Sequence, residues 1–176
     1  KVERGLKETG LFLEVMAPLP RAEMARFVQT METAKRLGAL CVRSACLSGR
    51  RYETFATLDE WNKFVADSKA AVARAVPVAN KIKQPFAIEN HKDWTIDEMV
   101  PLIKSYSSEY FGVCLDTGNN IALLDDPMEL VERLAPYALS THIKDMGVDE
   151  YEDGFLLSEV PIGDGMLDIP KIIAMV

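Results

Sequence analysis

The segments PFAIEN (85–90), FGVCLD (111–116) and LSTHIK (139–144) decide the fold of this chain. Each is an apolar run of strand length, and they carry in turn the ionisable residues Glu89, Asp116 and His142. Intervals of 27 and 26 residues separate these three, which suits one strand, one helix and two loops. The repeat predicts consecutive βαβ units and therefore a parallel sheet.

The same alternation extends toward the N-terminus. LFLEVMAP (11–18) and LCVRSACL (40–47) are two further strand candidates. Apolar residues at helical spacing run through 21–37 and 58–83, and Pro77 predicts a kink or break in the second segment. The chain therefore contains five recognisable strands with helices between them.

Capping signals mark where helices begin. Thr57–Glu60 and Thr95–Glu98 match the capping box, in which a hydroxyl and a glutamate satisfy the free amides of the first turn. Asp126 precedes a proline and predicts another helix start. Residues 146–166 predict a long loop or small hairpin, inserted before a last helix that starts near Asp168.

Three polar side chains are expected to converge at one end of the sheet. Parallel strands joined by right-handed crossovers have their C-terminal ends on the same side, so Glu89, Asp116 and His142 meet there. Taken singly, each would more often be a helix cap or a structural hydrogen-bonding group, but caps need not keep register with strand alternation. We therefore predict a divalent metal site of two carboxylates and an imidazole. The predicted face of these ligands also carries Ala87, Gly112, Cys114 and Ser140, whereas the opposite face carries Phe86, Ile88, Val113, Leu115, Leu139, Thr141 and Ile143.

The position of these residues selects the fold. An open doubly wound sheet forms its site where the strand order reverses, whereas a (β/α)8 barrel draws site residues from several successive strands. We predict the α/β barrel, which usually needs about 250 residues. The chain begins at Lys1 and stops inside the helical pattern IPKIIAMV. We therefore expect 1–176 to be a single incomplete barrel domain that lacks the first strand and the last one or two units.

Composition limits the classes of function that the chain can have. The 176 residues are 48% hydrophobic and 27% charged, which suits a folded core, and the net charge of −7 argues against nucleic-acid binding. Apolar runs stay shorter than the roughly 18 residues of a membrane span. Three cysteines without CxxC spacing favour a reducing, cytoplasmic location. A small molecule is the expected partner, and a homo-oligomer is possible.

Four motifs carry a resemblance to a known family. They are Ala87–His91, Leu115–Asn119, Thr141–Asp145 and the loop Ile162–Gly165, which is followed by Asp168. In this order they resemble the xylose-isomerase-like TIM-barrel superfamily of sugar isomerases and epimerases, most strongly over 85–170. The resemblance implies that Glu89, Asp116 and His142 bind a divalent ion on the fourth, fifth and sixth strands. A glutamate on the eighth strand usually completes such a site, and Glu159 is a poor substitute for it.

The hypothesis for the reaction is an enediolate-type proton transfer on a sugar or polyol, by an isomerase, an epimerase or a related dehydratase. The cofactor would be Mn²⁺, Mg²⁺, Co²⁺ or Zn²⁺, and Glu89 would be both ligand and proton-transfer base. Lys144 would stabilise negative charge or bind substrate, and His91 would contact substrate or hydrogen-bond a ligand. Asn119 occupies the place of a substrate-binding histidine in the ketose epimerases, and Val148 the place of their arginine, which argues against a ketose 3-epimerase.

Other readings stay open. A noncatalytic barrel that binds metal or carbohydrate is the main alternative, and an AP endonuclease-like repair enzyme is disfavoured by charge and histidine count. Glu14 and Arg43 lie on neighbouring predicted strands and are expected to form a buried ion pair rather than contact substrate. Cys114 is expected to be a packing residue without a histidine beside it. Gly163–Gly165 could bind a phosphate, although a tight turn is the preferred reading.

Overall fold

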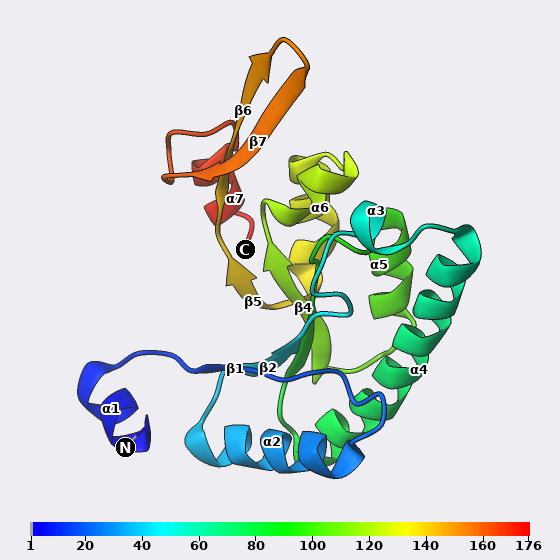
Figure 1. Ribbon diagram of the computed structural model, residues 1–176. Coiled ribbons are helices and arrows are strands. Elements are labelled where there is room, and N and C mark those ends of the chain that lie inside the picture. The colour runs from blue at the N-terminus through cyan, green and yellow to red at the C-terminus, as the bar shows by residue number, and fades with distance from the viewer. Residues whose placement is uncertain (1) are drawn as a thin grey trace.

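The computed structural model, which describes residues 2–176, contains a five-stranded parallel sheet in the order β1-β2-β3-β4-β5 (Figure 1). Every neighbouring pair is parallel and consecutive in the chain, as βαβ units require. The predicted α/β class is thus confirmed. The strands are β1 (Glu14–Met16), β2 (Cys41–Ser44), β3 (Phe86–Glu89), β4 (Phe111–Asp116) and β5 (Ala138–His142).

The helices between the strands pack on one face of the sheet, whereas the N-terminal helix lies apart from it and has no buried residue (Figure 1). Their apolar sides form the core with the outward residues of the strands, among them Phe86, Ile88, Val113 and Leu115. The helices are α1 (Val2–Thr9), α2 (Met24–Leu37), α3 (Arg51–Thr54), α4 (Leu58–Ile82), α5 (Ile96–Lys104), α6 (Pro127–Leu134) and α7 (Ile169–Ile173), with 3-10 turns η1 (Asn119–Leu123) and η2 (Ala135–Tyr137).

The predicted helix starts are confirmed. The Thr57 hydroxyl accepts from the Glu60 amide at 3.3 Å, and the Glu60 carboxylate accepts from the Thr57 amide at 3.1 Å. Asp126 accepts from two first-turn amides, each at 2.8 Å. Of the kink or break expected at Pro77, the break is wrong, because α4 runs through that residue and keeps its neighbours Val76 and Ala79 buried on the core.

The sheet is strongly curved, so that its two ends approach each other. Glu14 belongs to β1 and Ser140 to β5, at opposite ends of the strand order, yet the Ser140 hydroxyl donates to Glu14 at 2.7 Å. Small buried residues line the concave side: Cys41, Ala87 and Cys114. The sheet therefore forms a half-barrel whose interior is narrow enough for side chains to meet across it.

One irregularity sets the register of the last strand. β4 and β5 pair as Val113 with Ala138 but Cys114 with Ser140, so that Leu139 is an extra residue in a bulge. Its side chain packs on the concave cluster of Cys41, Ala87 and Cys114, which corrects the prediction that it faces the helices. Without the bulge, Asp116 would pair with Thr141; with it, Asp116 pairs with His142.

Gly112 leaves the space that the bulge needs. A β-carbon at this position would lie 2.9 Å from Leu139 Cγ and would also contact the Tyr137 carbonyl oxygen. No real side chain tolerates such contacts with backbone, so the glycine and the bulge depend on each other.

A β-hairpin projects from the body beyond β5 (Figure 1). It consists of β6 (Asp145–Tyr151) and β7 (Gly154–Val160), and it confirms the hairpin reading of residues 146–166. The buried Asp145 carboxylate anchors its base by accepting from four backbone amides. The donors are Met146 (2.9 Å), Gly163 (2.9 Å), Gly165 (3.0 Å) and Leu167 (3.2 Å). The glycine amides of the 163–165 turn are thus directed at a side chain of the protein itself, as a structural turn requires.

Replacing Gly112 with alanine should destabilise the protein by roughly 1–3 kcal/mol, because the new methyl group displaces Tyr137 or Leu139. Urea-induced unfolding measures this loss. Gly5→Ala is the matched control, since Gly5 lies in α1 with open space around it and should be neutral or slightly stabilising. Equal stability of the two variants would contradict the proposed dependence of the bulge on Gly112.

Candidate metal centre

Glu89, Asp116 and His142 are the last residues of β3, β4 and β5, as their spacing predicts. One ligand atom from each lies within 4.8 Å of the other two. His142 Nδ1 is 3.5 Å from Glu89 Oε1 and 4.0 Å from Asp116 Oδ2. Glu89 is 5% exposed and Asp116 is fully buried, while the His142 side chain remains 31% exposed. The structure therefore brings the three side chains to one point that solvent can reach.

Asp116 is held in a fixed orientation by the backbone that follows it. Its Oδ1 accepts from the amides of Gly118 at 3.0 Å and Asn119 at 2.9 Å. Its Oδ2 is buried and accepts no hydrogen bond from the described residues, although Lys144 Nζ lies 3.3 Å away as an ion pair. One oxygen is thus used to orient the carboxylate, and the other is left facing Glu89 and His142.

Asn90 holds β3 and β4 together at the level of the site. Its side-chain oxygen accepts from the Asp116 amide at 2.8 Å, and its amide nitrogen donates to the Asp116 carbonyl, also at 2.8 Å. The same Asn90 nitrogen also donates to Asn120 Oδ1 at 3.0 Å. The sequence did not indicate this role of Asn90, because a single amide side chain does not show which backbone group it will bond.

Glu14 and Arg43 form the expected ion pair, with Arg43 Nε donating to Glu14 Oε1 at 2.8 Å. The pair is also part of the site, which the sequence did not indicate. Arg43 Nη1 contacts Glu89, and Glu14 Oε1 lies 3.2 Å from His142 Nε2. Strand alternation does indicate that residues 14 and 43 share the concave face. It does not predict the curvature of the sheet that brings β1 close to β5.

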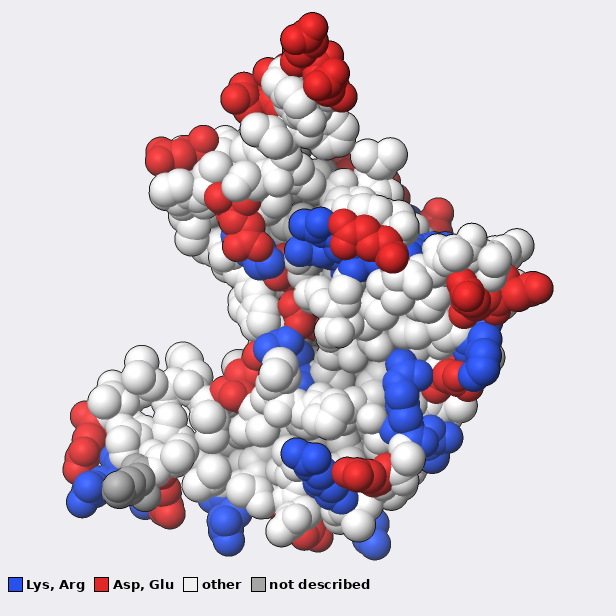
Figure 2. Space-filling model, viewed as in Figure 1, with Lys and Arg blue, Asp and Glu red and all other residues white. Residues whose placement is uncertain are grey.

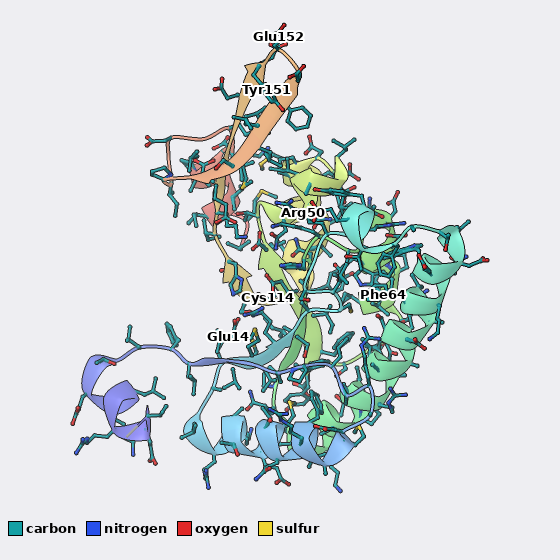
Figure 3. All side chains as sticks on the ribbon, in the orientation of Figure 1. Glu14, Arg50, Phe64, Cys114, Tyr151 and Glu152 are labelled. Atoms are coloured by element: carbon teal, nitrogen blue, oxygen red, sulfur yellow. The ribbon has the colours of Figure 1, made fainter. Side chains whose placement is uncertain are left out.

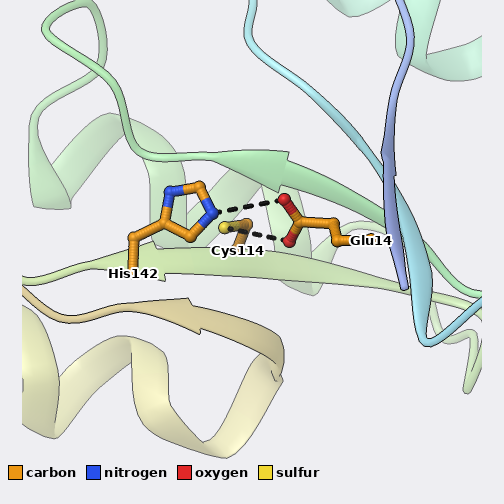
Figure 4. A group of neighbouring side chains, drawn as sticks. All are labelled: Glu14, Cys114 and His142. Carbon is orange, nitrogen blue, oxygen red and sulfur yellow. Dashed lines mark hydrogen bonds and ion pairs between the residues drawn. The ribbon is translucent and has the colours of Figure 1, made fainter. Parts of the chain in front are cut away.

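Cys114 lies below this network. Glu14, Cys114 and His142 also offer ligand atoms within 4.8 Å of one another (Figure 4). Cys114 Sγ is 3.9 Å from Glu14 Oε2. The expectation that no histidine stands beside Cys114 is wrong, because the bulge in β5 turns His142 toward it.

The charges shift the pKa values of the ligands. Hydrogen bonds with Cys114 and Glu89, and the negative charge of Glu14, raise the pKa of His142 above its usual range. Burial alone would raise the pKa of Glu89, but its hydrogen bond with His142 and the charge of Arg43 lower it. Glu89 is therefore an anion at neutral pH, and His142 carries a proton when no cation takes its place.

Lys144 and Asn119 lie at the rim of the three ligands. Besides Asp116, Lys144 Nζ contacts Asn119 Oδ1 at 3.2 Å and Glu159 Oε1 at 2.8 Å. Asn119 Nδ2 is 3.5 Å from Glu89 Oε1. Glu159 of the hairpin thus reaches the rim through Lys144, and it belongs to neither of the two groups with metal-ligand spacing.

Among the predicted site residues, His91 has the fewest contacts with the metal centre. Its Nδ1 is buried and finds no hydrogen-bond partner among the described residues. Burial lowers its pKa, so the ring is neutral. The hydrogen bond to a ligand that sequence analysis considered is not formed.

The residues fit a divalent cation. Two carboxylates and an imidazole are ligands that Zn²⁺, Mn²⁺ and Co²⁺ share, and the orphaned Asp116 oxygen is buried where such an ion would offset its charge. Glu89, Asp116 and His142 would hold the ion. In its absence Arg43, Lys144 and the His142 proton supply the positive charge.

Comparison with known proteins gives the site a context. Residues 6–176 match the family model described as xylose isomerase-like TIM barrel. The curated 3-oxo-isoapionate decarboxylase of Pectobacterium atrosepticum is 29% identical over 110 residues, which are 61% of this chain and 40% of that protein.

Solved structures share the fold. An IolI protein with a bound zinc atom superposes with a TM-score of 0.72 at 18% identity, over 99% of this chain and 66% of that one. A D-tagatose 3-epimerase-like protein gives a TM-score of 0.69 at 17% identity, over 99% and 69%. Sugar epimerases and dehydratases are among the other matches. The chain thus spans about two thirds of these barrels, and the predicted TIM-barrel fold is confirmed.

Within residues 2–176, no helix combines the length and the apolar character that a bilayer crossing requires.

Metal affinity should rise with pH. His142 must lose its proton to bind a cation, and its raised pKa keeps that proton in place at neutral pH. The apparent affinity for Zn²⁺ should therefore increase up to about tenfold per unit between about pH 6 and pH 8. Calorimetry in buffers of different ionisation enthalpy measures the released proton. His142→Ala should weaken binding and remove most of this slope; an unchanged slope in the variant would exclude His142 as a ligand.

Proposed function

We propose, from the premise that this chain belongs to the xylose isomerase-like TIM barrel family, that it is the metal-binding part of an enzyme that moves a proton on a sugar or polyol. An isomerase or epimerase is the reaction class that we favour, with a dehydratase as the related possibility. The observation that carries the proposal is the meeting of Glu89, Asp116 and His142 at one solvent-reachable point on three successive strand ends.

A divalent ion held by these three residues would polarise a substrate carbonyl and acidify the neighbouring C–H bond. Asp116 suits the role of a permanent ligand, because two backbone amides fix one oxygen while the other faces Glu89, His142 and the Lys144 ammonium. His142 suits the role of second ligand, because Glu14 contacts its Nε2, which leaves Nδ1 facing the two carboxylates.

Glu89 is the residue that we assign to proton transfer. Its carboxylate is ionised, because Arg43 and His142 lower its pKa, and one oxygen contacts Arg43 while the other faces His142 and Asn119. A carboxylate held at one oxygen can accept a proton at the other without losing its position. Arg43 therefore acts as a positioning residue for Glu89.

Lys144 is placed to stabilise negative charge that develops on a substrate oxygen. Its ammonium group is half-buried at the rim and is held by Asp116, Asn119 and Glu159. Although burial opposes it, the hydrogen bond with Glu159 and the charge of Asp116 raise its pKa, so it is a cation throughout the physiological range. Asn119, 2% exposed and bonded to the same lysine, would contact substrate together with it.

Names of the similar proteins span epimerisation, dehydration and decarboxylation. At a carbon beside a carbonyl group, each of these reactions builds negative charge on the carbonyl oxygen. A cation with a nearby lysine serves all three, so the constellation supports the general chemistry and leaves the choice among the reactions to the substrate.

We further propose that residues 1–176 form part of one barrel domain that works in the cytoplasm. A continuous core runs from Ala17 to Ile172 and joins all of the packed helices. The three cysteines, Cys41, Cys46 and Cys114, are free and buried, which suits a reducing compartment.

Glu89→Gln should abolish proton exchange while leaving the fold intact. Loss of the carboxylate removes both the base and one ligand charge, so exchange of a substrate C–H proton with deuterated solvent should fall by about 10²–10⁴-fold. NMR on the Mn²⁺-loaded full-length protein with a panel of aldoses and ketoses measures this rate. Glu132→Gln, an exposed glutamate of α6, is the control.

The panel also separates the alternative of a noncatalytic binding protein. Metal and sugar binding without any solvent exchange in the unaltered protein would favour that reading. Exchange that survives unchanged in Glu89→Gln would remove Glu89 from the mechanism.

A further inference from the structure

A cavity lies beside the metal centre, between the body of the half-barrel and the hairpin. Its volume is about 700 Å³, enough for a small sugar. The loop that precedes α3 contributes Arg50, the loop after β3 contributes Lys92, and the hairpin contributes Phe155 and Glu159. Figure 3 shows Arg50 near α3 and the base of the hairpin, well away from the hairpin tip at Tyr151 and Glu152.

This cavity adjoins the rim of the metal centre through residues that contact Glu89 and Lys144, while Glu89, Asp116 and His142 are not part of its lining. Asn119 lines it, and the same side chain contacts Glu89 and Lys144. Glu159 lines it as well and is bonded to Lys144. A substrate whose carbonyl end lies at Glu89, Asp116 and His142 would therefore extend its other end into this cavity.

The cavity has an excess of positive charge. Arg50 and Lys92 are the cations of its lining and Glu159 is its acidic residue, which shares the Lys144 ammonium with Asp116. Lys92 is half-buried and, in the described part of the chain, has no carboxylate within 4 Å. Arg50 is paired with the exposed Glu53 through one nitrogen, which leaves its other donors free. Figure 2 shows Lys and Arg side chains below the hairpin, with acidic side chains among them.

A backbone hydrogen bond joins the two loops that carry these cations. The amide of Arg51 donates to the carbonyl of Lys92 at 2.9 Å, which ties the loop of Arg50 to the loop of Lys92. Tyr52 and Phe155 also line the cavity and supply apolar surface. A lining that combines cations with apolar surface matches a molecule with C–H faces and one anionic group.

We propose that this cavity binds an anionic group of the substrate, so that the enzyme acts on sugars bearing a carboxylate or a phosphate rather than on neutral sugars. Lys92 and Arg50 are the residues that recognise the anion, and both lie outside the metal centre. The inference rests on the proposed function, because it takes the metal centre to be where the carbonyl end of the same molecule binds.

Calorimetry on the Mn²⁺-loaded full-length protein tests this with glucose, gluconate and glucose 6-phosphate. At least one of the anions should bind about tenfold more tightly than glucose, and which one does distinguishes carboxylate from phosphate. Lys92→Met and Arg50→Gln should each lower that affinity by about tenfold and leave glucose binding unchanged. Lys69→Met, an exposed lysine of α4, should change neither.

Absence of any preference for the anions, or a preference that Lys92→Met and Arg50→Gln leave intact, would overturn the proposal. Asp116→Asn separates this failure from that of the proposed function. If Asp116→Asn removes Mn²⁺ binding while the cavity variants change nothing, only the anion site is wrong. If Asp116→Asn leaves Mn²⁺ binding intact, the metal centre itself is wrong and the anion site loses its premise.

Discussion

Three carboxylates held around one imidazole cannot keep their charges without compensation, and this constraint governs the interior of the half-barrel. Glu14, Glu89 and Asp116 all lie near His142. Arg43 and Lys144 offset two of the three negative charges. The remaining charge is balanced either by a proton on His142 or by a bound cation, so protonation and metal binding compete for one position.

Geometry at the centre depends on features one layer away from it. The bulge at Leu139 shifts β5 so that His142 pairs with Asp116, and Gly112 makes room for that bulge. Asn90 then locks β3 to β4 by two hydrogen bonds with the backbone of Asp116. Strand pairing thus sets the position of each ligand, and the contacts of its side chain then set its orientation, which is how a rigid scaffold keeps a site ready for its ion.

Much of this arrangement was predictable from the sequence, because it follows from periodicity. The spacing of Glu89, Asp116 and His142 and the capping boxes are local or repeating signals, and the structure bears out the strand ends and helix starts that they predict. Alternation could not reveal the bulge at Leu139, since one extra residue leaves no mark on composition.

Contacts between distant segments could not be predicted from the sequence either. The approach of Glu14 to His142 depends on how far the sheet curves, which is a property of all five strands together. Lys92 and Arg50 lie in loops, where no period links a residue to its neighbours in space. At Pro77 the local preference was overridden, since the helix keeps its buried side in place through the proline.

The buried carboxylate of Asp145 anchors the base of the hairpin but not its outer part. Its four backbone hydrogen bonds fasten the stem, while Tyr151 and Phe155 lie exposed farther along. Those bonds come from main-chain groups and need glycine at position 165, where a β-carbon would collide with the Asp145 carboxylate, but they do not involve the side chains of the outer hairpin. Changes of sequence in the outer hairpin are therefore compatible with an unaltered half-barrel interior.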